Sequence, residues 1–164
     1  MTDPVDRLLG QWQRERPDLD TSPMAVVGRV SRIARHIDLA QRATFARYDL
    51  DPPGFDVLAT LRRTGEPFEL SAGDLMRSAM VTSGAITQRL DRLETRGLVR
   101  RSPHPRDGRV VLVSLTPAGR ELVDRVLPDH LATEERLLAG LTRQQRAALA
   151  DLLRTLDGAL ADDT

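Results

Sequence analysis

Residues 82–99, TSGAITQRLDRLETRGLV, are the stretch of sequence that decides the fold. The apolar residues Ile86, Leu90 and Leu93 recur there at positions i, i+4 and i+7, which predicts one buried face of an amphipathic helix. Hydroxyl residues precede this face and a glycine follows it, and both are typical of helix ends. The stretch therefore predicts a short helix with defined limits.

A second short helix is expected just upstream of the first. Ser71 can cap its start, Asp74 falls in its first turn, and Leu75 and Met76 can face inward. Only residues 77–81 separate this helix from the one described above. Two helices joined by so short a turn indicate a helix-turn-helix, in which the second helix is the recognition helix.

A β-hairpin is expected directly after the recognition helix. Residues 98–102 and 110–114 favour strands, and the segment PHPRDGR at 103–109 joins them. The formal net charge of the chain is zero, yet residues 89–109 hold seven arginines against three acidic residues. Any contact with DNA must therefore come from this local excess of positive charge.

The outward face of the recognition helix and the tip of the hairpin supply the candidate DNA contacts. Small residues at the start of the helix let its backbone approach DNA, while amide and guanidinium groups can pair with base edges or phosphates. The candidates are Ser83, Gly84, Thr87, Gln88, Arg92, Arg106, Asp107 and Arg109. Asp107 can either orient the Arg109 guanidinium or only shape the turn. The alternative for the helix is an ordinary solvated face.

Longer helices are expected on both sides of this region. Capping signals place helix starts at Asp3, Ser22, Thr116 and Thr142, and Pro128 should kink the third of these helices without ending it. Apolar residues at helical spacing continue along each of them. These terminal helices carry more apolar surface than one small lobe can cover, which predicts a homodimer.

The patterns together predict a mainly α fold with a small β-hairpin wing, in which a winged helix-turn-helix lobe joins a helical dimerisation lobe. We expect a single domain over residues 1–164, with the DNA-binding lobe at 53–114 and the dimerisation region at 1–50 and 115–164. The expected partner is double-stranded DNA, read by the dimer as a palindromic operator with half-sites about 10 base pairs apart.

Other functional classes find little support in the sequence. The chain has no cysteine, no run of apolar residues long enough to span a membrane and no N-terminal leader pattern, so we expect a cytoplasmic protein. No phosphate-binding loop or nucleophile motif is present, so we expect no enzyme and no cofactor. His130 and Glu134 have helical spacing without an evident third ligand, which favours a surface pair over a metal site. A winged helix that contacts only an acidic protein partner is the remaining alternative.

Over residues 24–160 the chain resembles the MarR (multiple antibiotic resistance regulator) family of transcription factors. The resemblance implies a triangular dimer whose N- and C-terminal helices interlock, with one winged lobe over each DNA half-site. It rests on five segments: FDVL at 55–58, SGAIT at 83–87, LETRGLV at 93–99, DGR at 107–109 and LTPAG at 115–119.

The predicted first helix, residues 3–16, is additional to the core of that family and resembles the extension of its urate-responsive branch. The resemblance implies an effector site made by Trp12, Asp56, Arg89 and Arg101, in which a small anion such as urate binds and releases a repressor from DNA. Related regulators sense tricarboxylates or phenolic compounds instead. Three of these residues also have a plainer interpretation: Trp12 as a packing anchor, Asp56 as a helix-terminus charge or ion-pair partner, and Arg101 as a phosphate contact.

Overall fold

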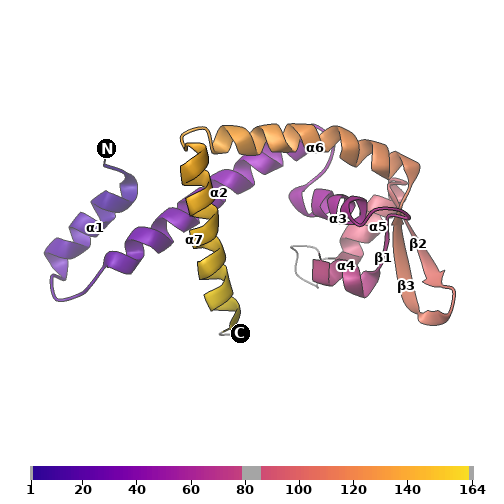
Figure 1. The fold of residues 1–164 in the computed structure, drawn as a ribbon, viewed down its shortest axis with the longest axis horizontal. Coiled ribbons are helices and arrows are strands. Elements are labelled where there is room, and N and C mark those ends of the chain that lie inside the picture. The colour runs from indigo at the N-terminus through magenta and orange to yellow at the C-terminus, as the bar shows by residue number, and fades with distance from the viewer. Residues whose placement is uncertain (1, 79–85, 163–164) are drawn as a thin grey trace.

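The computed structural model describes residues 2–78 and 86–162, so the predicted contacts Ser83 and Gly84 lie outside the described residues. Its elements form two lobes. The helical lobe contains α1 (Pro4–Glu15), α2 (Ser22–Ala46), α6 (Pro117–Leu137) and α7 (Arg143–Asp162). The winged lobe contains α3 (Pro52–Arg63), β1 (Glu69–Ser71), α4 (Ala72–Ser78), α5 (Ile86–Thr95), β2 (Val99–His104) and β3 (Asp107–Leu115). Figure 1 shows the winged lobe at one end of the molecule and α1 at the other.

Local capping groups fix the start of α1 as the sequence predicts. Asp3 accepts a hydrogen bond from the Asp6 backbone N–H at 2.8 Å, and Asp6 accepts one from the Asp3 N–H at 3.0 Å. Arg29 of α2 then binds both carboxylates, which holds α1 against α2. The backbone N–H of Asp6 and the Arg29 guanidinium keep the pKa of the Asp3 carboxyl below its usual value. The predicted caps Thr116 and Thr142 are confirmed in the same way, because each side chain accepts a hydrogen bond from the backbone N–H three residues ahead.

One expectation for the helices needs refinement, and the expected continuation of a helix through Pro128 is confirmed. Thr21, not Ser22, precedes α2, and its side chain makes no capping hydrogen bond. Asp20 instead accepts hydrogen bonds from the backbone N–H and the hydroxyl of Ser22, both at 2.9 Å. Pro128 lies inside α6, which continues through it to Leu137.

The sheet of the winged lobe has three antiparallel strands in the order β1-β3-β2. β2 and β3 form the predicted hairpin, with Val99 opposite Leu115. β1 was not predicted from the sequence, and it pairs Glu69 with Ser114 on the far edge of β3. Ser71 ends β1 and also caps α4, because its hydroxyl accepts a hydrogen bond from the Asp74 N–H at 3.0 Å.

The hydrophobic core lies in the winged lobe and continues into α6. Leu58, Leu61 and Leu75 are fully buried there together with Val113 of β3. Leu90 and Leu93 of α5 enter this core as their spacing predicts, and α6 contributes three buried residues, Leu122, Val123 and Val126. Burial of both α5 leucines fixes which face of that helix remains exposed.

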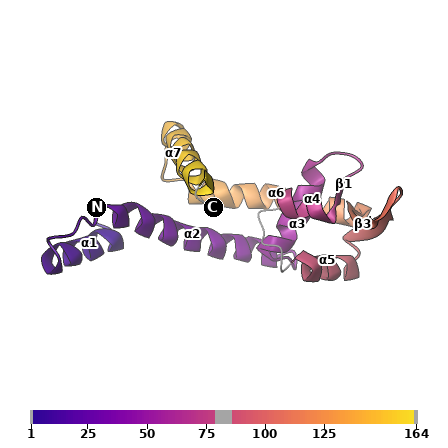
Figure 2. The ribbon, with the colours of Figure 1, turned by 90° about the horizontal axis from the view of Figure 1, so that it is seen from below.

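The helical lobe leaves apolar side chains in solvent. α2 and α6 run side by side, while α7 stands away from both (Figures 1 and 2). A buried hydroxyl pair, Thr44 Oγ1 and Thr133 Oγ1 at 2.8 Å, joins α2 to α6. The exposed apolar residues of α2 and α7 include Val26, Val27, Val30, Ile33, Leu149, Leu152, Leu153, Leu156 and Leu160. No helix within residues 2–78 and 86–162 is long and apolar enough to cross a membrane.

Candidate nucleic-acid interface

α5 presents a polar face to solvent because its leucines point into the core. Thr87, Gln88 and Arg92 are all exposed, as expected for the predicted recognition helix. Gln88 and Arg92 have the amide and guanidinium groups that pair with base edges in a major groove. Arg92 also lines a pocket beside α5, so its side chain is available both to DNA and to a molecule in that pocket.

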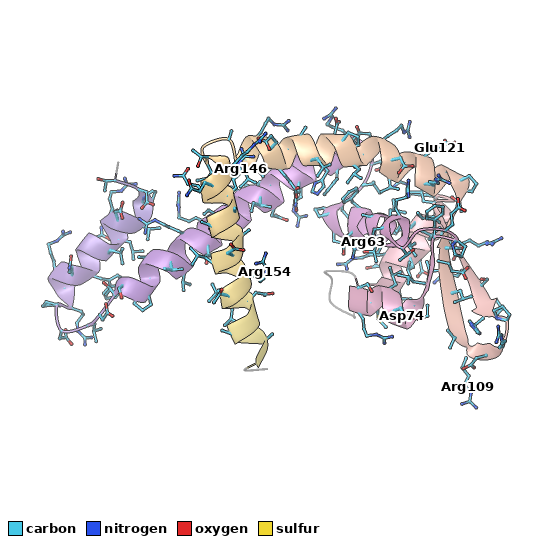
Figure 3. The ribbon with its side chains drawn as sticks, viewed as in Figure 1. Arg63, Asp74, Arg109, Glu121, Arg146 and Arg154 are labelled. Atoms are coloured by element: carbon cyan, nitrogen blue, oxygen red, sulfur yellow. The ribbon has the colours of Figure 1, made fainter. Side chains whose placement is uncertain are left out.

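The tip of the wing carries two exposed arginines. Arg106 and Arg109 flank the turn between β2 and β3, and Figure 3 shows Arg109 projecting away from the body of the molecule. The Asp107 carboxylate accepts a hydrogen bond from the Arg109 backbone N–H at 3.0 Å. Of the two predicted roles for Asp107, the structure shows the second: it shapes the turn through the backbone.

An ion-pair cluster braces the wing against α5. Glu94 of α5 accepts hydrogen bonds from the Arg101 backbone N–H and from Arg101 Nε, both at 2.8 Å. Asp91 Oδ1 lies 2.7 Å from Arg101 Nη2. Hydrogen bonds to Glu94, and to a smaller extent to Asp91, raise the pKa of Arg101. The hydrogen bonds from Arg101 in turn lower the pKa of Glu94. Arg101 therefore fixes the angle between wing and recognition helix.

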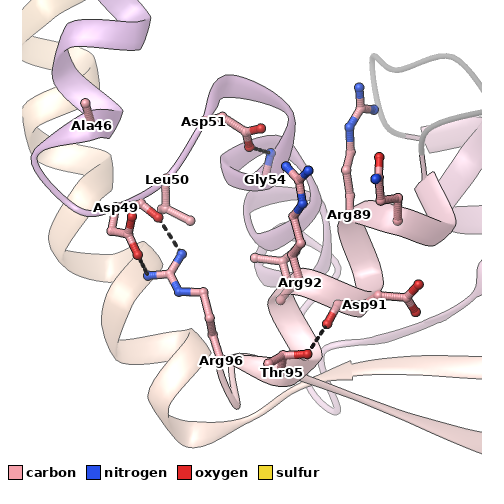
Figure 4. A pocket seen from close by; sticks show the side chains of 12 residues that line it. Ala46, Asp49, Leu50, Asp51, Gly54, Arg89, Asp91, Arg92, Thr95 and Arg96 are labelled. Atoms are coloured by element: carbon pink, nitrogen blue, oxygen red, sulfur yellow. Dashed lines mark hydrogen bonds and ion pairs between the residues drawn. The ribbon is translucent and has the colours of Figure 1, made fainter.

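A pocket of about 700 Å³ lies between α5 and the turn that joins α2 to α3. Three arginines line it, Arg89, Arg92 and Arg96, and they rise from the α5 side toward that turn (Figure 4). Three acidic residues, Asp49, Asp51 and Asp91, also line it. Arg89 is half-buried, and its Nη1 is buried with no hydrogen-bond partner among the described residues. A buried guanidinium N–H without a partner is costly, which favours an anion at this position.

The four residues implied as an effector site do not meet within one chain. Of the four, only Arg89 lines the pocket beside α5. Trp12 lines a separate apolar groove between α1 and α2, where 42% of its surface is exposed. α1 and α5 lie at opposite ends of the molecule in both views (Figures 1 and 2). Asp56 is half-buried on α3, and Arg101 is held by Glu94 and Asp91.

His130 packs in the core region as well as pairing along its helix. Its Nε2 lies 3.1 Å from Glu134 Oε1, the pair predicted from their spacing. Its ring contacts Phe45 and Phe55, with centroids 5.2 and 5.0 Å away. In the described part of the chain, no group of three or more His, Cys, Asp or Glu residues is placed to hold a metal ion.

Sequence reasoning missed two side chains that organise the interface. From the sequence, Glu94 and Arg96 contribute only charge and a place in the LETRGLV segment. In the structure, Glu94 binds Arg101 across the turn at Gly97, and the Arg96 guanidinium donates to the backbone carbonyls of Asp49 and Tyr48. The spacing of Glu94 and Arg101 weakly indicates their contact. A glycine that ends a helix lets the chain reverse direction, so that the strand that follows can lie beside the last helical turn. Nothing in the sequence pointed to the partners of Arg96.

Comparison with known proteins identifies close relatives of the chain. A model of the MarR family matches residues 48–110. The HTH-type transcriptional regulator PecS of Dickeya dadantii is 38% identical over 159 residues, which cover 97% of this chain and 96% of that protein.

Two solved structures agree with the sequence comparison. One describes regulation of DNA binding of Bordetella bronchiseptica BpsR by 6-hydroxynicotinic acid. It has a TM-score of 0.73 and 29% identity over 80% of this chain and 92% of that one. The other is a mutant MarR from E. coli complexed with operator DNA. It has a TM-score of 0.72 and 26% identity over 88% of this chain and 96% of that one.

Proposed function

Because this chain belongs to the MarR family of winged helix-turn-helix transcription regulators, we propose that it binds a palindromic operator as a homodimer and represses the adjoining promoter. The observation that carries this proposal is the shared exposure of Thr87, Gln88 and Arg92 on α5 beside Arg106 and Arg109 on the wing. A helix of this kind enters the major groove, and basic wing residues reach the backbone or the minor groove. A protein that acts on chromosomal DNA works in the cytoplasm of a bacterium.

The helical lobe supports the dimer in this proposal. α7 exposes five leucines along its length, and α2 exposes a stripe of valines and isoleucines. Apolar surface on this scale marks an interface, and a two-fold axis would place the same surface on both subunits. Residues 1–50 and 115–164 would then form the dimerisation region and 53–114 the DNA-binding lobe. A stable monomer at micromolar concentration in light scattering would overturn this part of the proposal.

Salt-dependent binding to duplex DNA tests the DNA-binding proposal. Binding that neutralises phosphates weakens as salt rises, because counterions are released from DNA. Arg109→Ala should lower affinity for all duplexes and reduce the slope of log K against log salt by about 1.8, because each subunit of the dimer loses one phosphate contact worth about 0.9. Arg16→Ala, which removes an exposed arginine paired with Asp18 beyond the end of α1, is the matched control and should leave the slope unchanged. If the folded wild-type dimer binds no duplex, the alternative of a winged lobe that contacts an acidic protein is favoured.

We further propose that a small aromatic anion, of the urate or hydroxynicotinate type, binds in the pocket beside α5 and releases the operator. Three arginines line this pocket beside Asp49, Asp51 and Asp91, and Arg96 already donates to the Asp49 and Tyr48 carbonyls. Arg89, whose Nη1 has no hydrogen-bond partner among the described residues, is therefore the main support for an anionic ligand. Arg92 is both a candidate base contact and a pocket residue, so a ligand that holds it would compete with DNA. Participation of Trp12 would require the groove of a second subunit, because the two sites lie far apart in one chain.

Operator affinity is the readout for the effector. Coupling of about 1–3 kcal/mol would weaken the operator complex roughly 5- to 150-fold at saturating ligand. Urate, 6-hydroxynicotinate, salicylate and citrate should each be titrated against the complex, since their ring and charge differ. Arg89→Ala should abolish the response, while Arg16→Ala should retain it. If none of these anions changes operator affinity, the effector proposal is wrong and the DNA-binding proposal stands.

A further inference from the structure

We propose that Arg96 is a positioning residue that fixes the recognition helix relative to the helical lobe and so sets the distance between the two DNA half-sites. The inference rests on the proposed DNA-binding function and adds to it a residue that need not touch DNA. It concerns the connection between α5 and the turn at residues 47–51, which joins α2 to α3 (Figure 4).

The guanidinium of Arg96 holds the backbone of that turn. Arg96 follows directly after α5, and its Nη1 donates to the Asp49 carbonyl oxygen. Its Nη2 lies 3.4 Å from the Tyr48 carbonyl oxygen and 3.5 Å from Asp49 Oδ2. The Asp49 side chain is 93% exposed, so the ion pair itself contributes little, and the hydrogen bonds to the carbonyls carry the contact.

The turn that Arg96 holds is itself fixed to the helical lobe. The Tyr48 hydroxyl donates to Asp129 Oδ2 of α6 at 2.7 Å, a hydrogen bond that raises the pKa of Tyr48. Leu50 is buried in the core, and its backbone N–H donates to the Phe45 carbonyl of α2 at 3.0 Å. Asp49 adopts a left-handed backbone conformation, with φ at 53°. Arg96 therefore binds a segment that is itself hydrogen-bonded to both α2 and α6.

A second attachment on another side of α5 makes the geometry restrictive. The Thr116 hydroxyl at the start of α6 donates to the Gly97 carbonyl oxygen at 2.6 Å, just after α5. α5 also packs on α3 and β2, and α3 in turn packs on α2 and α6 through the common core. Arg96 adds to that core a polar contact between the end of α5 and the α2–α3 turn. Without it, the end of α5 is held to the helical lobe by Thr116 and by the core alone. Loss of the Arg96 contact should leave the winged lobe folded and widen the range of its orientations.

Orientation matters because a two-fold dimer reads two half-sites at once. Recognition helices must lie about one helical turn apart, roughly 34 Å, to enter successive major grooves. A fixed lobe binds one spacing well and rejects others, while a pivoting lobe binds the correct spacing less tightly and discriminates less. Discrimination between spacings is therefore the property that a positioning role predicts.

The test compares Arg96→Ala with Arg16→Ala across operators of different spacing. Arg16 is an exposed arginine whose ion pair, at 2.7 Å to Asp18, lies beyond the end of α1 and does not join the two lobes. The probes are duplexes that carry the inverted repeat footprinted upstream of the protein's own gene, with one base pair added or removed between half-sites. Binding is measured by fluorescence anisotropy at several salt concentrations.

Arg96→Ala should weaken binding to the natural spacing about 10-fold, within the range of one lost specific contact, and leave the salt slope unchanged. It should also reduce the preference for that spacing over the altered ones, and Arg96→Lys should recover part of both properties. Arg16→Ala should match the wild type in both.

Two results would overturn the inference alone. The first is a salt slope reduced by about 1.8 with spacing preference intact, which marks one phosphate contact per subunit. The second is equal weakening at every spacing, which marks only lost folding. Absence of binding by the wild type would overturn the proposed function and this inference together.

Discussion

Substitution of Gly119 by alanine tests the junction between the two lobes. Gly119 lies in the first turn of α6, inside the LTPAG segment, and its backbone approaches the carbonyl of Leu98 at the end of the α5–β2 turn. A Cβ at position 119 would lie 2.0 Å from the Leu98 carbonyl oxygen, whereas ordinary contacts begin at 3.4 Å. One of the two backbones must therefore move by about 1.4 Å.

The neighbouring contacts make that movement costly. The Leu98 carbonyl oxygen accepts hydrogen bonds from the Thr116 backbone N–H at 3.1 Å and from its hydroxyl at 3.2 Å. Overpacking costs about 1–3 kcal/mol, and the upper end applies here because a backbone carbonyl cannot rotate away as a side chain can. Alanine also favours a helix over glycine by about 1 kcal/mol. The net expectation is a loss of about 2 kcal/mol in the free energy of unfolding.

Thermal denaturation at one fixed protein concentration measures this loss. A chain of this length should lose about 4–8 °C in Tm for about 2 kcal/mol. Gly10→Ala is the matched control, since α1 leaves the new methyl group free with Arg14 Nη1 at 3.8 Å, and it should raise Tm slightly. If Gly119→Ala is as stable as the wild type, the close approach at Leu98 does not constrain this junction and the reasoning fails.

Further predictions follow from the buried hydroxyls, the α1 carboxylates and the wing brace. Thr133→Val should lower the free energy of unfolding in urea by about 1–3 kcal/mol, because the buried Thr44 hydroxyl loses its partner and Arg136 loses an acceptor; the exposed Thr95→Val should change it far less. The pKa of Asp3 and Asp6 is lowered in the folded chain by the capping N–H groups and Arg29, so their contribution is complete above pH 3.8 and is lost as pH falls through the lowered values. Trp12 fluorescence should report loosening of α1 only below pH 3.8 in the wild type, and a change already complete by pH 5 would contradict this. Glu94→Ala should leave Arg101 held by Asp91 alone, and the looser wing should lower the ratio of operator affinity to random-duplex affinity in anisotropy titrations. An unchanged ratio would show that the contacts of Glu94 do not orient the wing.

The sequence by itself determined the elements whose signals are local. The caps of α1, α6 and α7 act over three residues, so Asp3, Thr116 and Thr142 could be assigned without knowledge of the fold. The leucine spacing of α5 and the strand-forming runs on either side of 103–109 likewise determined the recognition helix and the wing. A buried face with helical period leaves only one outward face, so the exposure of Thr87, Gln88 and Arg92 followed directly.

Only the tertiary structure decided which distant groups meet. β1 has three residues and pairs with a strand more than 35 residues away, so no local sequence pattern predicts it. Arg101 pairs with Glu94 and Asp91 because the turn at Gly97 returns the chain beside α5, and Arg96 finds two carbonyls of a turn that precedes it by nearly 50 residues. Trp12 and Arg89, linked by resemblance alone, lie in different pockets because α2 carries α1 away from the winged lobe. Spacing along a helix fixes the direction of a side chain, whereas its partners depend on how the helices pack.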